Sequence, residues 1–152
     1  VRHCDWVVGC YYLVRREVID QVGLFDPRYF LYFEEVDHCF AAKKAGWDVV
    51  FYPYTTVVHL GGESAKSSGE ITKTGRQLSA LQMESELLYF RKNHGLGGVL
   101  LDVFLSVTAD LVTTLKRLIK PTNAAELAAG WRHARLLITL FFRTRGGIRP
   151  TR

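Results

Sequence analysis

Residues 29–47 read YFLYFEEVDHCFAAKKAGW, which places a cluster of carboxylates between an aromatic run and a helical pattern. The three acidic side chains at the start of that pattern suit the positive end of a helix dipole, and the two lysines at its end suit the negative end. Gly46 follows, and glycine is common just after the last residue of a helix. The segment therefore predicts a helix over residues 34–45 with acidic groups in its first turn.

The flanking segments indicate an α/β unit. Residues 6–14 are rich in β-branched and aromatic side chains and predict a buried strand, and residues 15–22 predict a short helix. Two further strands are expected over residues 49–52 and 55–60.

A change of pattern divides the chain. Residues 61–75 contain four Gly, three Ser and two Thr, which is typical of a mobile loop. Three helices are expected after it, over residues 77–93, 98–120 and 124–142. We therefore expect an α/β part over residues 1–75 and a helical part over residues 76–152.

Charge is distributed unevenly along the 152 residues, whose net charge is +5. Residues 116–152 hold nine Lys or Arg and one Glu, whereas residues 1–115 hold eleven basic and fourteen acidic side chains. Such a basic end favours an anionic partner, either a lipid surface or a nucleic acid. The basic residues border Leu, Ile and Phe runs and lack interleaved aromatics on polar faces, so an anionic membrane surface is favoured and no nucleic acid is expected.

The helix expected near residues 96–119 is long enough to cross a bilayer. Its polar side chains recur at steps of three or four and so share one face: Asp102, Ser106, Asp110, Thr113 and Arg117. Two aspartates near the middle of a bilayer are costly. The pattern therefore favours a helix in the membrane interface, or packed on the protein, over one that spans the membrane.

Cysteine usage and the first residue bear on the setting of the chain. Cys4, Cys10 and Cys39 form no CxxC pair, which favours reduced thiols in a cytosolic setting over a disulfide scaffold. Val1 is not an initiator methionine, so the sequence is expected to be a piece of something longer.

Two features could carry chemistry. The Glu34-Glu35-Val36-Asp37 cluster lies beside aromatic residues, whose apolar surroundings raise the pKa of a carboxylate toward that of a useful base. The alternative for this cluster is helix capping. His59, at the end of an expected strand before two glycines, suits a metal or phosphate ligand, and the alternative is a structural histidine.

Five ordered blocks over about residues 1–95 resemble family 2 glycosyltransferases, and most closely the bacterial rhamnosyltransferases of cell-surface polysaccharide synthesis. The blocks are Asp5-Trp6-Val7-Val8-Gly9 with Leu13–Glu17, Val22–Asp26, Tyr29–Cys39, Ala45-Gly46-Trp47, and Pro53 with Val58-His59 and Gly61–Ser64. The resemblance implies the C-terminal portion of a GT-A nucleotide-sugar-binding α/β sandwich, followed by amphipathic helices.

The same resemblance implies roles for individual residues. Glu35 takes the place of the catalytic base, with Asp37 as the second candidate for that role. His59 matches the histidine that completes a divalent-metal site for Mg²⁺ or Mn²⁺. The implied substrate-binding residues are Trp6, Gly9, Tyr32 and Glu34.

By this resemblance the chain is part of an inverting glycosyltransferase. The donor is a nucleotide-diphosphate sugar, with rhamnose suggested by the sub-type, and the acceptor is a lipid-linked or cell-surface glycan. The basic helical end is expected to hold the enzyme as a peripheral protein on the cytoplasmic face of the plasma membrane.

Departures from the family pattern leave two alternatives open. Ala41 stands where an arginine is usual, and His38 stands where a large apolar residue is usual. The nucleotide-binding first half, with its Asp-x-Asp segment, has no counterpart in the chain. The alternatives are therefore a catalytically inactive fragment and a basic amphipathic membrane-binding module.

Overall fold

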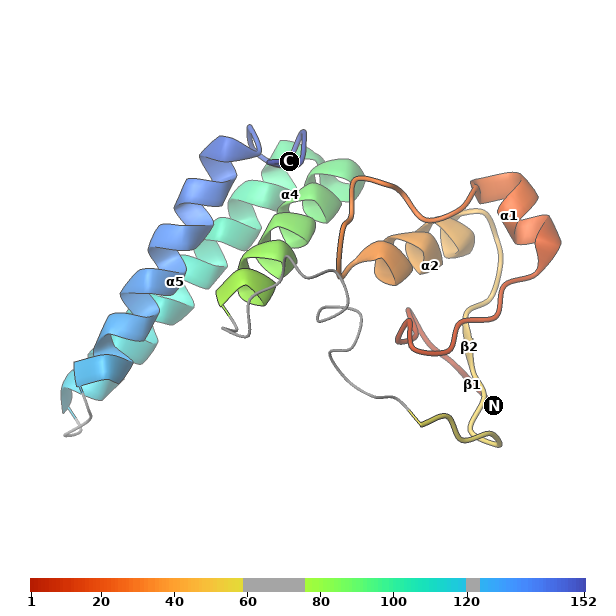
Figure 1. The fold of residues 1–152 in the computed structure, drawn as a ribbon, viewed down its shortest axis with the longest axis horizontal. Helices are drawn as coiled ribbons and strands as arrows, with labels where there is room; N and C mark the ends of the chain where they lie inside the picture. The colour runs from red at the N-terminus through yellow and green to blue at the C-terminus, as the bar shows by residue number, and fades with distance from the viewer. Residues whose placement is uncertain (59–75, 120–123) are drawn as a thin grey trace. The chain divides into compact units, whose positions relative to one another are not determined.

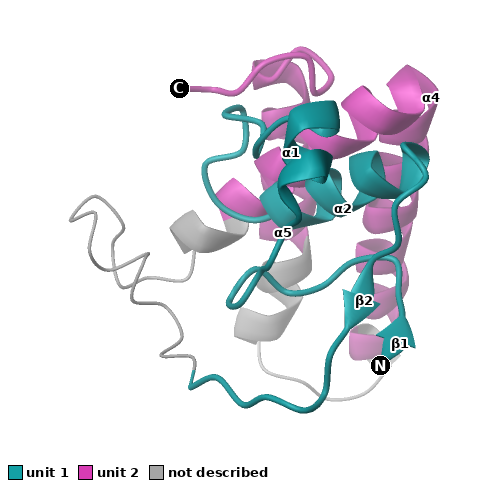
Figure 2. Ribbon diagram, turned by 90° about the vertical axis from the view of Figure 1, so that its right-hand side faces the viewer, with its two compact units in different colours: residues 1–78 teal, residues 79–152 magenta. Residues whose placement is uncertain are grey.

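The computed structural model describes residues 1–58, 76–119 and 124–152. It divides the chain into two compact units, Val1–Leu78 and Ser79–Arg152, which Figure 2 shows in different colours. Unit 1 contains helices and a small sheet, whereas unit 2 is helical (Figure 1).

The described residues of unit 1 hold four short elements. Strands β1 (Arg2–His3) and β2 (Val50–Phe51) pair antiparallel, with Arg2 opposite Phe51. Helices α1 (Arg16–Val22) and α2 (Glu34–Lys44) contact each other. The buried apolar side chains among residues 1–58 are Val18, Tyr29, Cys39, Ala42 and Val49.

The two helices confirm the expected pattern, and their ends have the expected causes. Gly23 follows α1 with φ 86°, and its N–H bonds to the carbonyl of Ile19. Gly46 follows α2 with φ 91°, and its N–H bonds to the carbonyl of Lys43. Both glycines adopt a backbone conformation that other residues reach only with strain.

The predicted strands are mostly wrong. Residues 6–14 form an irregular segment with a turn near Gly9, residues 55–58 have no strand geometry, and residues 59–60 lie outside the described part. Of residues 49–52, only β2 is a strand. A strand needs a hydrogen-bonded neighbour, and β1 and β2 are the only such pair that the described residues provide. A GT-A sandwich is therefore not seen within the described residues.

Unit 2 is a bundle of three helical segments (Figure 1). Helix α4 (Arg76–Ile119) breaks at Gly95, whose φ of 71° and ψ of −168° are not helical, so its two halves, residues 76–94 and 96–119, lie side by side. Helix α5 (Ala124–Arg143) packs along them. The three segments meet in one apolar core, formed by Met83, Leu87, Val99, Leu137 and Leu140.

Candidate functional site

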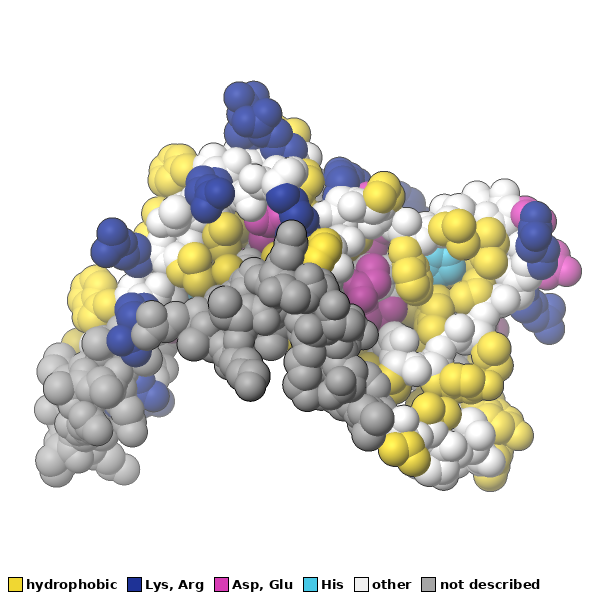
Figure 3. Space-filling view, viewed as in Figure 1, with side chains coloured by type: hydrophobic (Ala, Val, Ile, Leu, Met, Phe, Trp, Pro, Cys, Tyr) yellow, Lys and Arg dark blue, Asp and Glu magenta, His cyan; other side chains and the backbone are white. Residues whose placement is uncertain are grey.

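The carboxylates of Glu34 and Glu35 begin α2 and are half-buried. One oxygen of each, Oε2, is buried and has no hydrogen-bond partner among the described residues. Figure 3 shows acidic side chains gathered at this end of the helix. Buried carboxylate oxygens are normally paired, so two unpaired ones at the start of one helix are suited to receive a hydroxyl group of a substrate.

The backbone leading into these carboxylates is strained. Tyr32 and Phe33 both adopt left-handed φ values of 69°, although neither is glycine. Bulky residues seldom take this conformation, which costs about 1–2 kcal/mol each. Such strain concentrates at functional sites, and here it sets the direction in which α2 begins and hence the placement of Glu34 and Glu35.

Gly9 lies against Glu35. A Cβ atom built on Gly9 would be 3.6 Å from Cδ of Glu35, which is ordinary contact. The irregular segment 6–14 therefore covers one side of this carboxylate. The structure thus brings together two residues that the sequence assigned to one site.

Burial is the main cause that raises the pKa of Glu34, and the negative charge of Glu35 adds to it. Two adjacent carboxylates favour protonation of one of them. Both causes disfavour the charged form of Glu34.

A buried histidine holds the covering segment on α2. His38 places Nε2 3.0 Å from the carbonyl oxygen of Gly23, so Nε2 carries the proton in the neutral ring. Nδ1 then accepts a hydrogen bond from the hydroxyl of Tyr12 at 2.8 Å. The thiol of Cys39 lies 3.4 Å from the same hydroxyl. Burial, Cys39 and the charge of Glu35 together raise the pKa of Tyr12.

Sequence reasoning missed Tyr12 and His38. They are 26 positions apart, and no local spacing indicates that they meet. The only signal was that a histidine stood where the family pattern has an apolar side chain.

Asp37 faces a different environment from Glu35. Asp37 is buried. The pKa of Tyr29 is raised mainly by burial of its hydroxyl and further by the charge of Asp37. Arg28 lies near Asp37 and forms an ion pair with Asp26 at 2.7 Å. Asp37 thus has Tyr29 and Arg28 as neighbours, whereas Glu35 has Gly9.

The remaining predicted substrate residues are exposed. Trp6 has 49% of its side-chain surface exposed and makes no hydrogen bond or ring contact within the described residues, and Tyr32 is 39% exposed. A cavity of about 490 Å³ lies elsewhere in unit 1, lined by Tyr12, Val14, Trp47 and Val49 among others. None of the predicted site residues that the structure describes lines it.

The predicted metal ligand His59 lies outside the described residues. Within residues 1–58, 76–119 and 124–152, no three His, Cys, Asp or Glu side chains converge on a point that could hold a metal ion. Glu34 and Glu35 supply carboxylate oxygens of the kind that Mg²⁺ and Mn²⁺ prefer, but they do not form a complete ligand set.

Polar side chains of residues 96–119 are directed toward the other helices of unit 2. Oδ2 of Asp110 lies 2.7 Å from Nδ1 of His133 on α5. Asp102 is half-buried, and its charge reaches Glu86 on the first half of α4. The amphipathic pattern is confirmed, and its polar face meets the other helices of unit 2.

The opposite face of this helix is apolar and exposed. Its side chains are Leu96, Leu100, Leu101, Phe104, Leu105, Leu111, Val112 and Leu115. Among the described residues, one helical stretch, Ala80–Arg117, is apolar and long enough to cross a membrane. Only 6% of its most apolar part is buried. Figure 3 shows basic and hydrophobic side chains interleaved on the visible face of unit 2.

Comparison with known proteins gives a family and two relatives. The family described as "Glycosyltransferase like family 2" matches residues 3–80. The relatives are the N-acetylglucosaminyl-diphospho-decaprenol L-rhamnosyltransferases of Mycobacterium tuberculosis strains CDC 1551 / Oshkosh and ATCC 25618 / H37Rv. Each is 47% identical over 58 residues.

The aligned segment is 38% of this chain and 19% of each curated relative. No solved structure matches the chain. The family match spans half of the chain and includes α2 with its carboxylates. The chain therefore belongs to family 2 of the glycosyltransferases and is rhamnosyltransferase-like in sequence.

Proposed function

We propose that this chain supplies the catalytic base and acceptor side of an inverting glycosyltransferase. The enzyme moves a sugar, with rhamnose favoured by the two relatives, from a nucleotide-diphosphate donor to a lipid-linked or cell-surface glycan. One observation carries the proposal: Glu34 and Glu35 hold unpaired, buried carboxylate oxygens at the start of α2, inside the family match.

Glu35 acts as the general base. Its free oxygen accepts the proton of an acceptor hydroxyl while that hydroxyl oxygen forms a bond to the anomeric carbon. The bond from that carbon to the donor phosphate breaks, and the nucleotide diphosphate leaves with the bonding electrons. Base catalysis of this kind contributes about 10²–10⁴-fold to the rate.

The other predicted residues bind and orient the substrate. Glu34 hydrogen-bonds a sugar or acceptor hydroxyl through its buried, unpaired Oε2. Gly9 leaves room for the substrate beside Glu35, since a side chain there would fill that space. Trp6 and Tyr32 offer exposed aromatic faces to a sugar ring.

A divalent cation, Mg²⁺ or Mn²⁺, is part of the proposal, with His59 as its ligand from this chain. The cation supplies charge neutralisation for the leaving diphosphate. The support is the place of His59 within the residues that the family match covers.

The proposal also places the enzyme on the cytoplasmic face of the membrane, where a lipid-linked acceptor is within reach. The supporting observation is the exposed apolar face of residues 96–119. Exposed aromatic side chains on α5 add to it, namely Trp131 at 64% and Phe142 at 70%. Basic residues near an anionic surface contribute about 1 kcal/mol each.

Transfer is tested with the protein expressed from its complete reading frame. It is incubated with a nucleotide-diphospho-rhamnose and lipid-diphospho-N-acetylglucosamine, and the lipid product is measured. We expect transfer that requires the acceptor lipid. Hydrolysis of the donor alone, at the same rate with and without acceptor, would show that the acceptor assignment is wrong.

The second candidate function is a basic membrane-binding module, which the same apolar face favours. The isolated 152-residue chain is expected to pellet with anionic vesicles, to be partly released by high salt, and to transfer no sugar. Transfer by the isolated chain would refute this second candidate function. Equal binding to neutral and anionic vesicles would indicate a spanning helix.

A further inference from the structure

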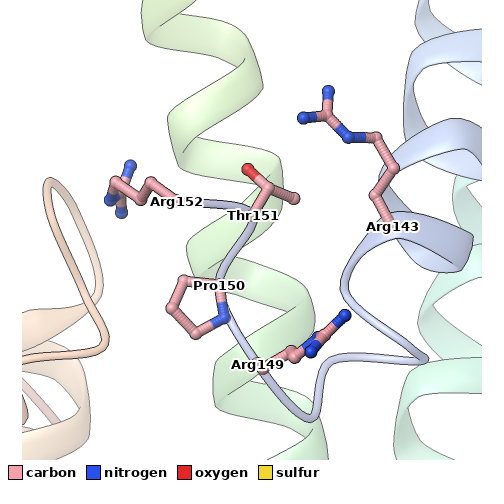
Figure 4. A pocket seen from close by; sticks show the side chains of 5 residues that line it. All are labelled: Arg143, Arg149, Pro150, Thr151 and Arg152. Carbon is pink, nitrogen blue, oxygen red and sulfur yellow. The ribbon is translucent and has the colours of Figure 1, made fainter.

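A pocket of about 360 Å³ lies where α5 ends in unit 2. It is lined by Arg143, Arg149, Pro150, Thr151 and Arg152. Figure 4 shows Arg143 and Arg149 on one side of Thr151, and Arg152 extending to the other side. None of these residues belongs to the carboxylate site on α2.

A rigid turn sets the spacing of the two arginines. Thr144 is fully buried, and its hydroxyl donates to the carbonyl of Leu140 at 2.8 Å and accepts from the N–H of Gly147 at 3.0 Å. The N–H of Arg149 bonds to the carbonyl of Thr144 at 3.1 Å. Arg149 is thus tied by hydrogen bonds to the end of the helix that carries Arg143.

The turn also fits tightly against α4. Gly147 has φ 77°, and a Cβ atom there would lie 2.2 Å from the carbonyl oxygen of Leu87. This distance is too short for any side chain to be accommodated. Only glycine allows this approach. The pocket wall is therefore fixed in advance, which lowers the entropic cost of binding a ligand.

A buried carboxylate holds the other wall. Glu84, 2% exposed, accepts hydrogen bonds from the N–H of Thr151 at 3.2 Å and from its hydroxyl at 2.5 Å. Arg152 lies 3.6 Å from the same carboxylate. The charge of Glu84 is thus matched by Arg152 and is not directed at the other arginines.

Arg143 and Arg149 remain without an ion-pair partner among the described residues. Both guanidinium groups are positively charged and line the same pocket. Their planar forks suit phosphate oxygens, which they bind in a bidentate manner. The pocket is therefore suited to a ligand with one or two phosphate groups.

The surroundings favour a lipid phosphate over a nucleotide. No aromatic side chain among the described residues lines the pocket, so they offer nothing for a base to stack on. Leu96 approaches the same turn, because a Cβ atom on Gly146 would lie 3.6 Å from its Cδ1. The exposed apolar face of residues 96–119 begins at Leu96. A polar head at the arginines would thus have an apolar surface beside it for its chain.

We propose that Arg143 and Arg149 bind the diphosphate group of a lipid-linked substrate, whose hydrocarbon chain lies along the exposed face that begins at Leu96 and Leu100. This inference rests on the proposed function, which requires a lipid-linked acceptor. It adds a binding site on unit 2 for the anionic head of that lipid.

The test measures binding of the chain to phosphatidylcholine vesicles that contain a polyprenyl diphosphate. Vesicles with the same surface charge from phosphatidylglycerol are the comparison. We expect about 10-fold tighter binding to the diphosphate vesicles. The R143A/R149A variant should lose this preference, and the control R132A/R135A, which removes two exposed arginines of α5 outside the pocket, should keep it.

Two further measurements separate the sources of phosphate. Leu100→Gln should weaken binding to the diphosphate vesicles, and inorganic diphosphate should compete only weakly. Equal losses in both arginine pairs, or no preference in the unmodified chain, would overturn the site. Equally tight binding of inorganic diphosphate would overturn the lipid assignment. Circular dichroism verifies that each variant keeps its helices.

The binding assay contains no sugar donor, so it is independent of catalysis. Absent transfer with an intact lipid preference would count against the proposed catalytic function. Normal transfer with no lipid preference would count against this site alone.

Discussion

The hydroxyl of Tyr12 lies 2.8 Å from Nδ1 of His38, and this hydrogen bond ties the irregular segment over α2 to the helix that carries Glu35. The ring of His38 is held at its other nitrogen by the carbonyl of Gly23. Phe25 packs edge-on against the same ring, with centroids 5.6 Å apart. The histidine thus joins three segments of unit 1 beside the candidate base.

Tyr12→Phe is expected to destabilise unit 1 by about 1–3 kcal/mol, because it leaves the buried Nδ1 of His38 without a donor. Chemical denaturation followed by tryptophan fluorescence measures the loss. The matched control is Tyr11→Phe, since Tyr11 is 53% exposed and should tolerate the change. Equal effects of the two substitutions would show that the hydrogen bond contributes nothing.

Glu35→Gln is expected to lower turnover by at least about 10²-fold in the protein expressed from the complete reading frame. Glutamine keeps the volume but cannot accept the proton, so donor affinity should stay nearly unchanged. Steady-state kinetics separate the two effects. If this variant kept its turnover while Asp37→Asn was inactive, the base would be Asp37.

Removal of divalent metal with a chelator is expected to abolish transfer, and Mg²⁺ or Mn²⁺ should restore it. His59→Ala should raise the metal concentration needed for activity and weaken donor binding together, because one ligand serves both. Titrations of metal and donor measure the two constants. Unchanged values in the variant would make His59 a structural residue.

Gly95→Ala is expected to destabilise unit 2 by about 1–3 kcal/mol, because φ 71° with ψ −168° is nearly closed to other residues. No atom lies within 4 Å of the added methyl group, so the cost comes from the backbone alone. Gly97→Ala is the control: it also meets open space but lies in a helix, and it should stabilise by up to about 1 kcal/mol. Urea unfolding followed by the circular dichroism of the helices measures both changes. Equal shifts of the unfolding midpoint in the two variants would contradict this reasoning.

Unit 2 should lose stability as the pH rises from about 4 toward neutrality. Burial raises the pKa of Asp102. Burial also raises the pKa of Glu86, the charge of Asp102 adds to this increase, and His133 partly offsets it. The folded state then binds more protons than the unfolded state between the ordinary and the raised pKa. The stabilising effect is complete below the ordinary pKa and is lost above the raised one. Thermal unfolding across this range measures it.

The substitution Asp102→Asn should flatten that pH dependence and stabilise unit 2 at neutral pH by no more than about 1 kcal/mol, because the carboxylate keeps partial contact with water. Asp110→Asn makes the same chemical change on the same helix. It should destabilise the unit, because it weakens the 2.7 Å contact with His133. Shifts of the same sign in both variants would refute this account.

Local sequence was sufficient where the determining forces are local. The helix at residues 34–44 follows from its charged ends and from Gly46, and the helices after residue 76 follow from their apolar periodicity. The resemblance to the glycosyltransferase family also rested on residues read in order, and the family match over residues 3–80 confirms it. The position of Glu34 and Glu35 at a helix start was thus available from sequence alone.

Tertiary structure decided what depends on distant partners. Residues 6–14 have the composition of a strand, yet they form no ladder in the described structure, because strand formation needs a paired neighbour. The contacts of His38 with Tyr12 and of Glu84 with Thr151 join residues 26 and 67 positions apart, which no periodicity reports. The sequence by itself determined which segments are helical and where the carboxylates begin. Only folding decided which side chains lie beside Glu35 and which arginines line one pocket, because burial and hydrogen bonding depend on neighbours that are distant in sequence.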